Sequence, residues 1–282
     1  MSPVVPPSPL SVESGPVRLA GDRWGDGAGP PVVLLHGGGQ TRHSWDRTAE
    51  RLAGSGRTAI TMDARGHGDS AWDPDGDYGL EAFAGDLVRI LGAVGAPAVL
   101  VGASLGGITA LVVAGDRPDL VAGLVLVDVV VRVEPAGVRR IQEFMTAHPD
   151  GFATLDEVAD AIAAYTPERR RARNLDGLRK NVRQGADGRW RWHWDPAFVS
   201  TGDEPRVDRR ARIEQATARV AAPTMIVRGG RSDVVSDEGL ADMTRRLPHA
   251  RVADVAAAGH MVAGDDNDVF GAALDDFLDE LG

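Results

Sequence analysis

Residues 99–108, with the sequence VLVGASLGGI, place a serine where it could act as a nucleophile. An apolar run precedes Ser104, glycines stand two residues before and two residues after it, and a segment able to form a helix follows. A serine that projects from a sharp strand-to-helix turn needs small neighbours there, because the strained backbone leaves no room for side chains. The N–H of Leu105, at the start of that helix, could stabilise the negative charge on a carbonyl oxygen under attack. The pattern predicts nucleophilic attack on an acyl group.

A second glycine-rich segment, His36-Gly37-Gly38-Gly39, follows the apolar run Val32–Leu35. Glycines at such a strand end let the backbone approach a substrate carbonyl, and the N–H of Gly38 could supply a second hydrogen bond to the oxyanion. The alternative is a turn whose glycines serve backbone geometry alone. Ser104 further along the chain favours the catalytic interpretation. For His36 and for His67, which lies between two glycines, we predict structural roles.

The elements that would position these residues are short apolar runs alternating with segments of helical period. The predicted strands are Val32–Leu35, Thr58–Met62, Ala98–Val101, Leu124–Val127, Thr224–Val227 and, more weakly, Arg251–Val255. These runs are apolar throughout, which is typical of parallel strands covered on both faces. Apolar residues recur at three- and four-residue steps over 80–94 and 270–281, which predicts helices there. Strands alternating with helices indicate an α/β fold with a mostly parallel central sheet.

One long region interrupts this alternation. Residues 132–212 contain no convincing buried strand but hold helix-like pieces at Val138–Ala147, Leu155–Tyr165 and Pro167–Arg183. So long a stretch between two core strands predicts an inserted helical cap over the carboxyl ends of the strands, where open α/β sheets bind ligands. A surface elaboration remote from the site is the alternative. We therefore expect a flexible tail over residues 1–15, a core over 16–131 and 213–282, and the cap over 132–212.

Together with the segment Asp63-Ala64-Arg65-Gly66-His67-Gly68-Asp69-Ser70, these motifs resemble the α/β-hydrolase superfamily from about residue 20 onward. In that family the chain order is nucleophile, acid, histidine. The resemblance implies Ser104 as nucleophile, Asp233 as acid and His260 as general base. Asp128 also follows a strand between Ser104 and His260, so chain order alone leaves it open as the acid. The Gly229-Gly230 turn favours Asp233.

The cap carries a tryptophan stripe at Trp190, Trp192 and Trp194. If this segment is extended, the three indoles share one face. They could form an aromatic wall over the substrate pocket, or they could anchor the cap to the body by burying apolar area. We favour anchoring, with the pocket wall as the alternative.

Composition excludes several functions. The chain has 31 Lys and Arg against 41 Asp and Glu, a net charge of −10, which disfavours nucleic acid as a partner. It has no cysteine, which removes disulfides, thiolate nucleophiles and zinc-finger sites. No metal-binding histidine pair, phosphate-binding loop or dinucleotide fingerprint occurs, so we expect neither metal nor cofactor. No apolar run is long enough to span a bilayer, so we expect no membrane partner and a cytoplasmic monomer or homodimer.

The sequence therefore predicts a cofactor-free serine hydrolase, of the carboxylesterase kind, that cleaves an ester-like bond in a small to medium, largely apolar substrate. Epoxide hydrolases and haloalkane dehalogenases that it resembles use an aspartate where this chain has Ser104. The resemblance also admits lactonase, thioesterase, perhydrolase and carbon–carbon bond hydrolase, which the fold does not separate. A receptor-like protein that keeps the triad but turns over negligibly is an alternative of another class.

Overall fold

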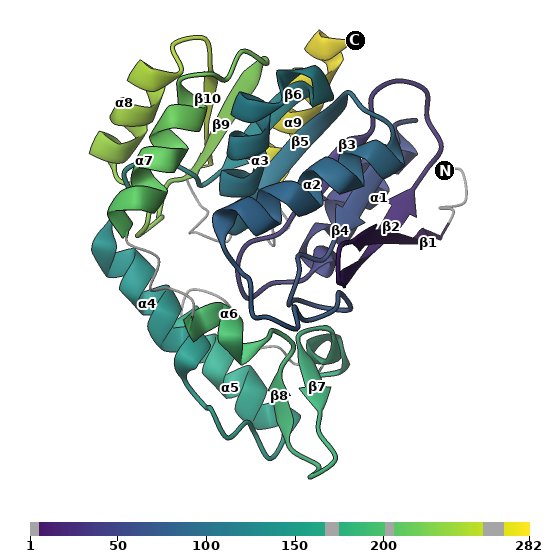
Figure 1. Cartoon of the computed structure of the whole chain (residues 1–282), viewed down its shortest axis with the longest axis vertical. Coiled ribbons are helices and arrows are strands. Elements are labelled where there is room, and N and C mark those ends of the chain that lie inside the picture. Colours follow the sequence, from purple (N-terminus) through teal and green to yellow (C-terminus); the bar gives the residue numbers. More distant parts are fainter. Residues whose placement is uncertain (1–5, 167–174, 201–205, 256–267) are drawn as a thin grey trace.

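A computed structural model describes residues 6–166, 175–200, 206–255 and 268–282, and within them it has a central sheet of eight strands (Figure 1). The spatial order is β1-β2-β4-β3-β5-β6-β9-β10. The strands span β1 Ser8–Ser14, β2 Val17–Trp24, β3 Val32–Leu35, β4 Ala59–Met62, β5 Ala98–Ala103, β6 Val121–Val127, β9 Thr224–Gly229 and β10 Arg251–Val255.

The six strands from β4 to β10 in this spatial order run parallel, and β2 pairs antiparallel with both β1 and β4. Each of the six predicted strands is present. The central ones are buried along their whole length, as their uninterrupted apolar sequences require. The predicted mostly parallel sheet is confirmed.

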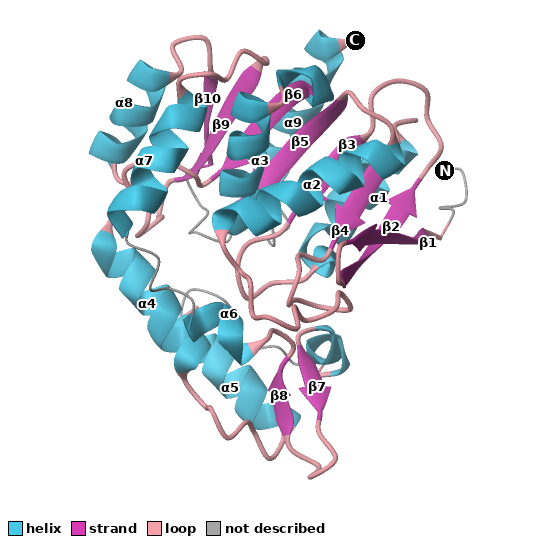
Figure 2. Cartoon of the chain, in the orientation of Figure 1, coloured by secondary structure: helices cyan, strands magenta, loops and turns pink. Residues whose placement is uncertain are grey.

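Helices cover both faces of the sheet (Figure 2). Their bounds are α1 Asp46–Gly54, α2 Leu80–Val94, α3 Leu105–Asp116, α7 Arg206–Thr217, α8 Asp237–Arg246 and α9 Asp268–Leu281. Because side chains alternate along a strand, Val33 packs in the core shared with α2, α3, α7 and α8, whereas Val32 and Leu34 pack in the core shared with α1 and α9. The two apolar layers fix the strand ends that carry the candidate site.

The insertion between β6 and α7 forms a lobe beside the sheet, and we call its residues 135–200 the cap (Figure 1). Its elements are α4 Pro135–Thr146, α5 Leu155–Tyr165, the 3-10 helix Asp176–Lys180, β7 Val182–Gln184, β8 Trp190–Trp192 and α6 Pro196–Ser200. Phe152, Val158 and Val182 belong to a small apolar cluster of its own. The cap is therefore a packed unit rather than a single loop.

The structure adds two short strands to the cap and corrects one predicted helix. Residues 182–184 and 190–192 form a two-stranded antiparallel sheet, and neither strand is buried along its length, so the expectation of no convincing buried strand holds for the described part of the cap. The predicted helix Pro167–Arg183 is wrong at its carboxyl end, which is the strand β7, and its residues 167–174 lie outside the described residues. Short, half-exposed strands such as these lack the apolar run by which a buried strand is recognised.

The sequence-predicted flexible tail over residues 1–15 is also wrong for residues 8–14, which form β1. This strand pairs with β2 along its whole length, from Ser8 opposite Arg23 to Ser14 opposite Val17. Because β1 lies at the edge of the sheet, it tolerates Pro9 and polar residues that a central strand would exclude.

At the carboxyl end of the insertion, α7 crosses the boundary predicted at residue 212. Gly115 of α3 packs directly against the backbone of Ala216 in α7.

Candidate active site

Ser104 stands at the turn between β5 and α3, as the sequence predicts. Its φ of 46° and ψ of −113° are a strained combination for a residue with a side chain. A Cβ on Gly106 would lie 2.5 Å from the carbonyl oxygen of Leu35, and one on Gly102 would lie 2.5 Å from the Gly106 oxygen. The two flanking glycines are therefore required by close backbone packing, which is the physical reason for the motif.

Two backbone N–H groups adjoin this serine. Leu105 begins α3, and the turn from Gly37 to Gln40 passes beside Ser104, since a Cβ on Gly37 would lie 3.3 Å from the Ser104 Cβ. In the part of the chain that the structure describes, the N–H groups of Gly38 and Leu105 have no hydrogen-bond acceptor. N–H groups held in this way can donate hydrogen bonds to a developing oxyanion without prior rearrangement.

His36 and His67 take the structural roles predicted for them. His36 accepts a hydrogen bond from the Ala64 N–H (3.0 Å) and donates to the Gly37 oxygen (2.8 Å). His67 accepts from the Gly39 N–H (3.1 Å) and donates to the Arg65 oxygen (3.0 Å). Burial lowers the pKa of His36 to about 4, and burial together with the neighbouring His36 lowers the pKa of His67 to about 3. Both rings are neutral at pH 7 and hold the loops around Gly38.

Asp128 is buried at the end of β6, the strand that pairs with β5. Its φ of 54° is another strained value, and Val127 before it accepts a hydrogen bond from the Ser104 N–H (3.3 Å). The carboxylate accepts hydrogen bonds from the Gly229 N–H (3.2 Å) and from the Ser232 hydroxyl (2.6 Å). A buried, hydrogen-bonded carboxylate therefore lies one strand from the serine.

Asp233, which the family context favours as the acid, has different surroundings. Its side chain is 37% exposed and forms an ion pair with Arg140 of α4 (3.1 Å). His260 lies outside the described residues. The structure brings Ser104, Gly38 and Leu105 together, and the assignments of Asp233 and His260 stay predictions.

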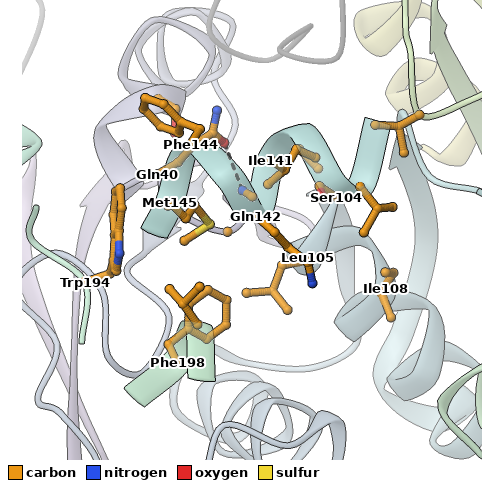
Figure 3. Close-up of a pocket in the computed structure, with 18 of the residues that line it drawn as sticks. Gln40, Ser104, Leu105, Ile108, Ile141, Gln142, Phe144, Met145, Trp194 and Phe198 are labelled. Atoms are coloured by element: carbon orange, nitrogen blue, oxygen red, sulfur yellow. Dashed lines mark hydrogen bonds between the residues drawn. The ribbon is translucent and has the colours of Figure 1, made fainter. Parts of the chain in front are cut away.

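A cavity of about 830 Å³ opens beside Ser104, within the usual size range for small-molecule sites. The body contributes the residues next to the serine, and the cap contributes most of the apolar wall (Figure 3). Cap residues in this wall include Ile141, Phe144, Met145, Ile162, Tyr165, Trp192, Trp194 and Phe198. The shape and chemistry suit an apolar group of several carbons or an aromatic ring.

Two of the three tryptophans line the cavity, and the third packs within the cap itself, which is neither of the two roles considered for it. Trp192 and Trp194 stack in parallel with ring centroids 5.0 Å apart, and both line the cavity. Trp190 does not line it; its ring packs in the cap cluster and lies 4.9 Å from the Arg179 guanidinium. Trp192 and Trp194 therefore form part of the pocket wall, and Trp190 stabilises the cap itself.

The cavity also has charged residues at its edge, most of them at least partly exposed. Lys180 pairs with Asp46 (2.9 Å) and Arg210 pairs with Glu214 (3.1 Å). Arg132 and Arg209, both exposed, line the same cavity.

Among the described residues, no group of three His, Asp or Glu side chains is placed to bind a metal ion. No helix in the described ranges is both long enough and apolar enough to traverse a bilayer.

Comparison with known proteins agrees with this geometry. Residues 30–266 match the family described as alpha/beta hydrolase fold. The chain belongs to this family. The match extends from just before β3 to beyond β10 and includes the cap.

Several relatives of this α/β hydrolase are similar along most of its length. An esterase of Mycobacterium tuberculosis is 36% identical, over 86% of this chain and 80% of the relative. The 3-hydroxybutyrate-oligomer hydrolase of Cupriavidus necator is 30% identical, over 86% and 87%. Among solved structures, E-2-(acetamidomethylene)succinate hydrolase superposes with a TM-score of 0.84 at 25% identity, covering 97% of this chain and all of that one.

Sequence reasoning missed three contributors to the hydrolase site. The Ser232 hydroxyl donates a hydrogen bond to Asp128. His193 and Phe198 of the cap contact the glycine loops of the body. Partners so distant in sequence leave no local motif. The single available signal was the position of His193 within the tryptophan stripe.

Proposed function

We propose that this α/β hydrolase is a serine carboxylesterase that works through an acyl-enzyme. One observation carries the proposal: the strained Ser104 turn opens on an apolar cavity, beside the two backbone N–H groups of Gly38 and Leu105 that lack acceptors in the described structure. The relatives named as an esterase and as an oligoester hydrolase support the same bond type.

In the proposed mechanism, the Ser104 hydroxyl attacks the ester carbonyl while His260 takes its proton. The tetrahedral oxyanion accepts hydrogen bonds from Gly38 and Leu105. His260 then returns the proton to the departing alcohol, which leaves an acyl-enzyme. Water, deprotonated by the same histidine, cleaves the acyl-enzyme and restores the Ser104 hydroxyl.

For the acid that orients His260, we propose Asp128 in place of the predicted Asp233. Such a carboxylate works best when it is buried and held by hydrogen bonds, because it must fix one tautomer and stabilise the imidazolium. Asp128 is buried and is held by Gly229 and Ser232. Asp233 is partly exposed and is engaged by Arg140. In addition, β6 adjoins the serine strand β5, whereas β9 is one strand further away.

The proposed substrate is an ester with an apolar acyl or alcohol group, small to medium in size. The aromatic and aliphatic wall of the cap supports this choice, since burying a charged group there would remove its hydration without a partner. Because the exposed Arg132 and Arg209 also line the cavity, an ester with a carboxylate at its far end is the alternative substrate to compare with the apolar ones.

The proposal is tested with p-nitrophenyl butyrate and a fluorophosphonate label. Ser104→Ala should melt like the wild type and lose roughly 10⁴-fold in kcat, and the label should map to the Ser104 peptide. Sustained turnover separates an enzyme from a receptor-like protein, which would release product equal to the protein concentration and then stop. An alanine variant that keeps more than about a tenth of the activity would refute the nucleophile assignment.

The acid is tested by two matched amide substitutions. Asp128→Asn should lower kcat by roughly 10²–10⁴-fold, whereas Asp233→Asn should stay within about threefold of the wild type. The opposite ranking would restore Asp233 as the acid. Melting temperatures of both variants show whether a loss of activity reflects unfolding.

A further inference from the structure

Hydrogen bonds hold the turn that carries Gly38 both before and after that residue in the chain. The Gly37 oxygen accepts from the Gln40 N–H (3.1 Å) and from His36 (2.8 Å). The Gly37 N–H in turn donates to the Gln40 side chain (2.9 Å). These bonds fix the peptide group before Gly38 and leave the Gly38 N–H free to serve a substrate.

The peptide groups after Gly38 are fixed through Gly39. Its N–H donates to His67 (3.1 Å), and its oxygen lies 3.4 Å from Nε2 of His193, which belongs to the cap. Nδ1 of His193 accepts a hydrogen bond from the Gly68 N–H (2.8 Å). Because a neutral imidazole with an accepting Nδ1 carries its proton on Nε2, His193 donates to the Gly39 oxygen.

His193 is well suited to hold this geometry. It is 1% exposed, and burial together with the neighbouring His67 and His36 lowers its pKa well below the usual value. The ring is therefore neutral at pH 7 with a defined tautomer. One cap side chain thus bridges two body loops, the turn after β3 and the turn after β4.

The residues that follow His193 hold the same part of the cap in place. The Asp195 N–H donates to the Gly66 oxygen (2.8 Å), and the Tyr78 hydroxyl donates to the Asp195 carboxylate (2.5 Å). A Cβ on Gly38 would lie 3.4 Å from the Phe198 ring, and this ring meets the His67 ring edge-on, with centroids 4.6 Å apart. The cap segment therefore has little freedom to move independently of the Gly38 turn.

We propose that His193 is a positioning residue for the oxyanion site. It acts through the Gly39 carbonyl and orients the Gly38 N–H, so that the cap as well as the body sets the geometry of transition-state stabilisation. This inference rests on the proposed serine-esterase function. It assigns the cap a part in the rate of the chemical step, in addition to its part in forming the pocket wall.

Two substitutions separate the two sides of the imidazole. His193→Gln places an amide N–H near the position of Nε2 and can still donate to the Gly39 oxygen. His193→Asn places an amide oxygen near the position of Nδ1, so it can accept from Gly68 but cannot reach Gly39. Arg183→Ala is the matched control, because Arg183 joins the cap to Asp69 of the same body turn (2.7 Å) and does not line the cavity.

Kinetics on p-nitrophenyl butyrate, normalised to the sites titrated by a fluorophosphonate, give the test. His193→Asn should lower kcat about tenfold with KM within about twofold, since removal of an oxyanion donor altogether costs roughly 10²–10³-fold. His193→Gln should recover most of that loss, and Arg183→Ala should stay within about twofold in both parameters.

Any of these kinetic outcomes would overturn the inference: wild-type kcat in His193→Asn, an equal loss in Arg183→Ala, or an effect confined to KM. None of them touches the proposed function, which fails instead if Ser104→Ala stays active. A loss in both His193 variants with fewer titrated sites would show that the residue serves folding alone, and would also reject the positioning role.

Discussion

Acidification should destabilise the fold because its buried histidines are held neutral. The unfolded chain binds protons on them with a pKa near 6.5, whereas burial lowers the pKa of His36 to about 4 and that of His67 to about 3. Below pH 6.5 the unfolded state therefore binds more protons than the folded state does. Their stabilising contribution is complete above pH 6.5 and is lost as the pH falls toward the folded-state values.

The size of the effect follows from the same numbers. Between pH 7.5 and 5, each of these two histidines should remove about 2 kcal/mol from the free energy of unfolding, since one pKa unit corresponds to about 1.4 kcal/mol. Aspartates with lowered pKa, such as Asp46 and Asp187, titrate in the unfolded state near 3.8 and contribute little in this interval. The loss of about 4 kcal/mol expected from His36 and His67 together is a large part of a typical stability of 5–15 kcal/mol, and the buried His193 adds to it.

Urea unfolding at pH 7.5 and pH 5, followed by tryptophan fluorescence, measures this loss. His193→Gln removes one further buried histidine and should make the loss smaller. A loss below about 1 kcal/mol in the wild type would refute the neutral, hydrogen-bonded state of these rings.

Two further predictions concern the serine turn and the pocket. Gly106→Ala should lower the free energy of unfolding by about 1–3 kcal/mol or more and abolish labelling of Ser104, because the added Cβ would clash with the Leu35 backbone. Thermal melts measure the loss of stability, and the control Gly85→Ala, whose Cβ meets open space, should show none. Values of kcat/KM for acetyl, butyryl and hexanoyl esters should rise several-fold per carbon, at roughly 0.8 kcal/mol per buried methylene, until the cavity is filled. If a succinyl ester had the highest kcat/KM, the apolar-substrate proposal would be wrong, and Arg132 or Arg209 would be the candidate to bind its carboxylate.

The core of the fold could be predicted because its strands are apolar on both faces. The uninterrupted apolar runs Val32–Leu35 and Ala98–Val101 predict buried strands, and the structure has β3 and β5 at these positions. The edge strand β1 and the cap strands β7 and β8 gave no such signal, since a strand with one exposed face and few residues has no distinctive composition. Propensity alone could not find them.

For the site, the sequence predicted the residues that stand within local motifs. Ser104 and its glycines satisfy a steric rule that acts over five residues, so the motif contains its own explanation. His193 meets Gly39 across 154 positions, and Ser232 meets Asp128 across 104. Such contacts depend on how the cap and the sheet ends are brought together, which no local pattern records.

The edge strand β1 matters for anyone who shortens this chain. The proline-rich start invites removal of the first fifteen residues, yet that cut would strip β1 from β2 and uncover Val17 and Leu19, both fully buried. The row of backbone N–H and C=O groups on β2 would then face solvent beside apolar side chains. Such an open edge recruits strands from other molecules, so the shortened protein would be prone to aggregate although every catalytic group remained.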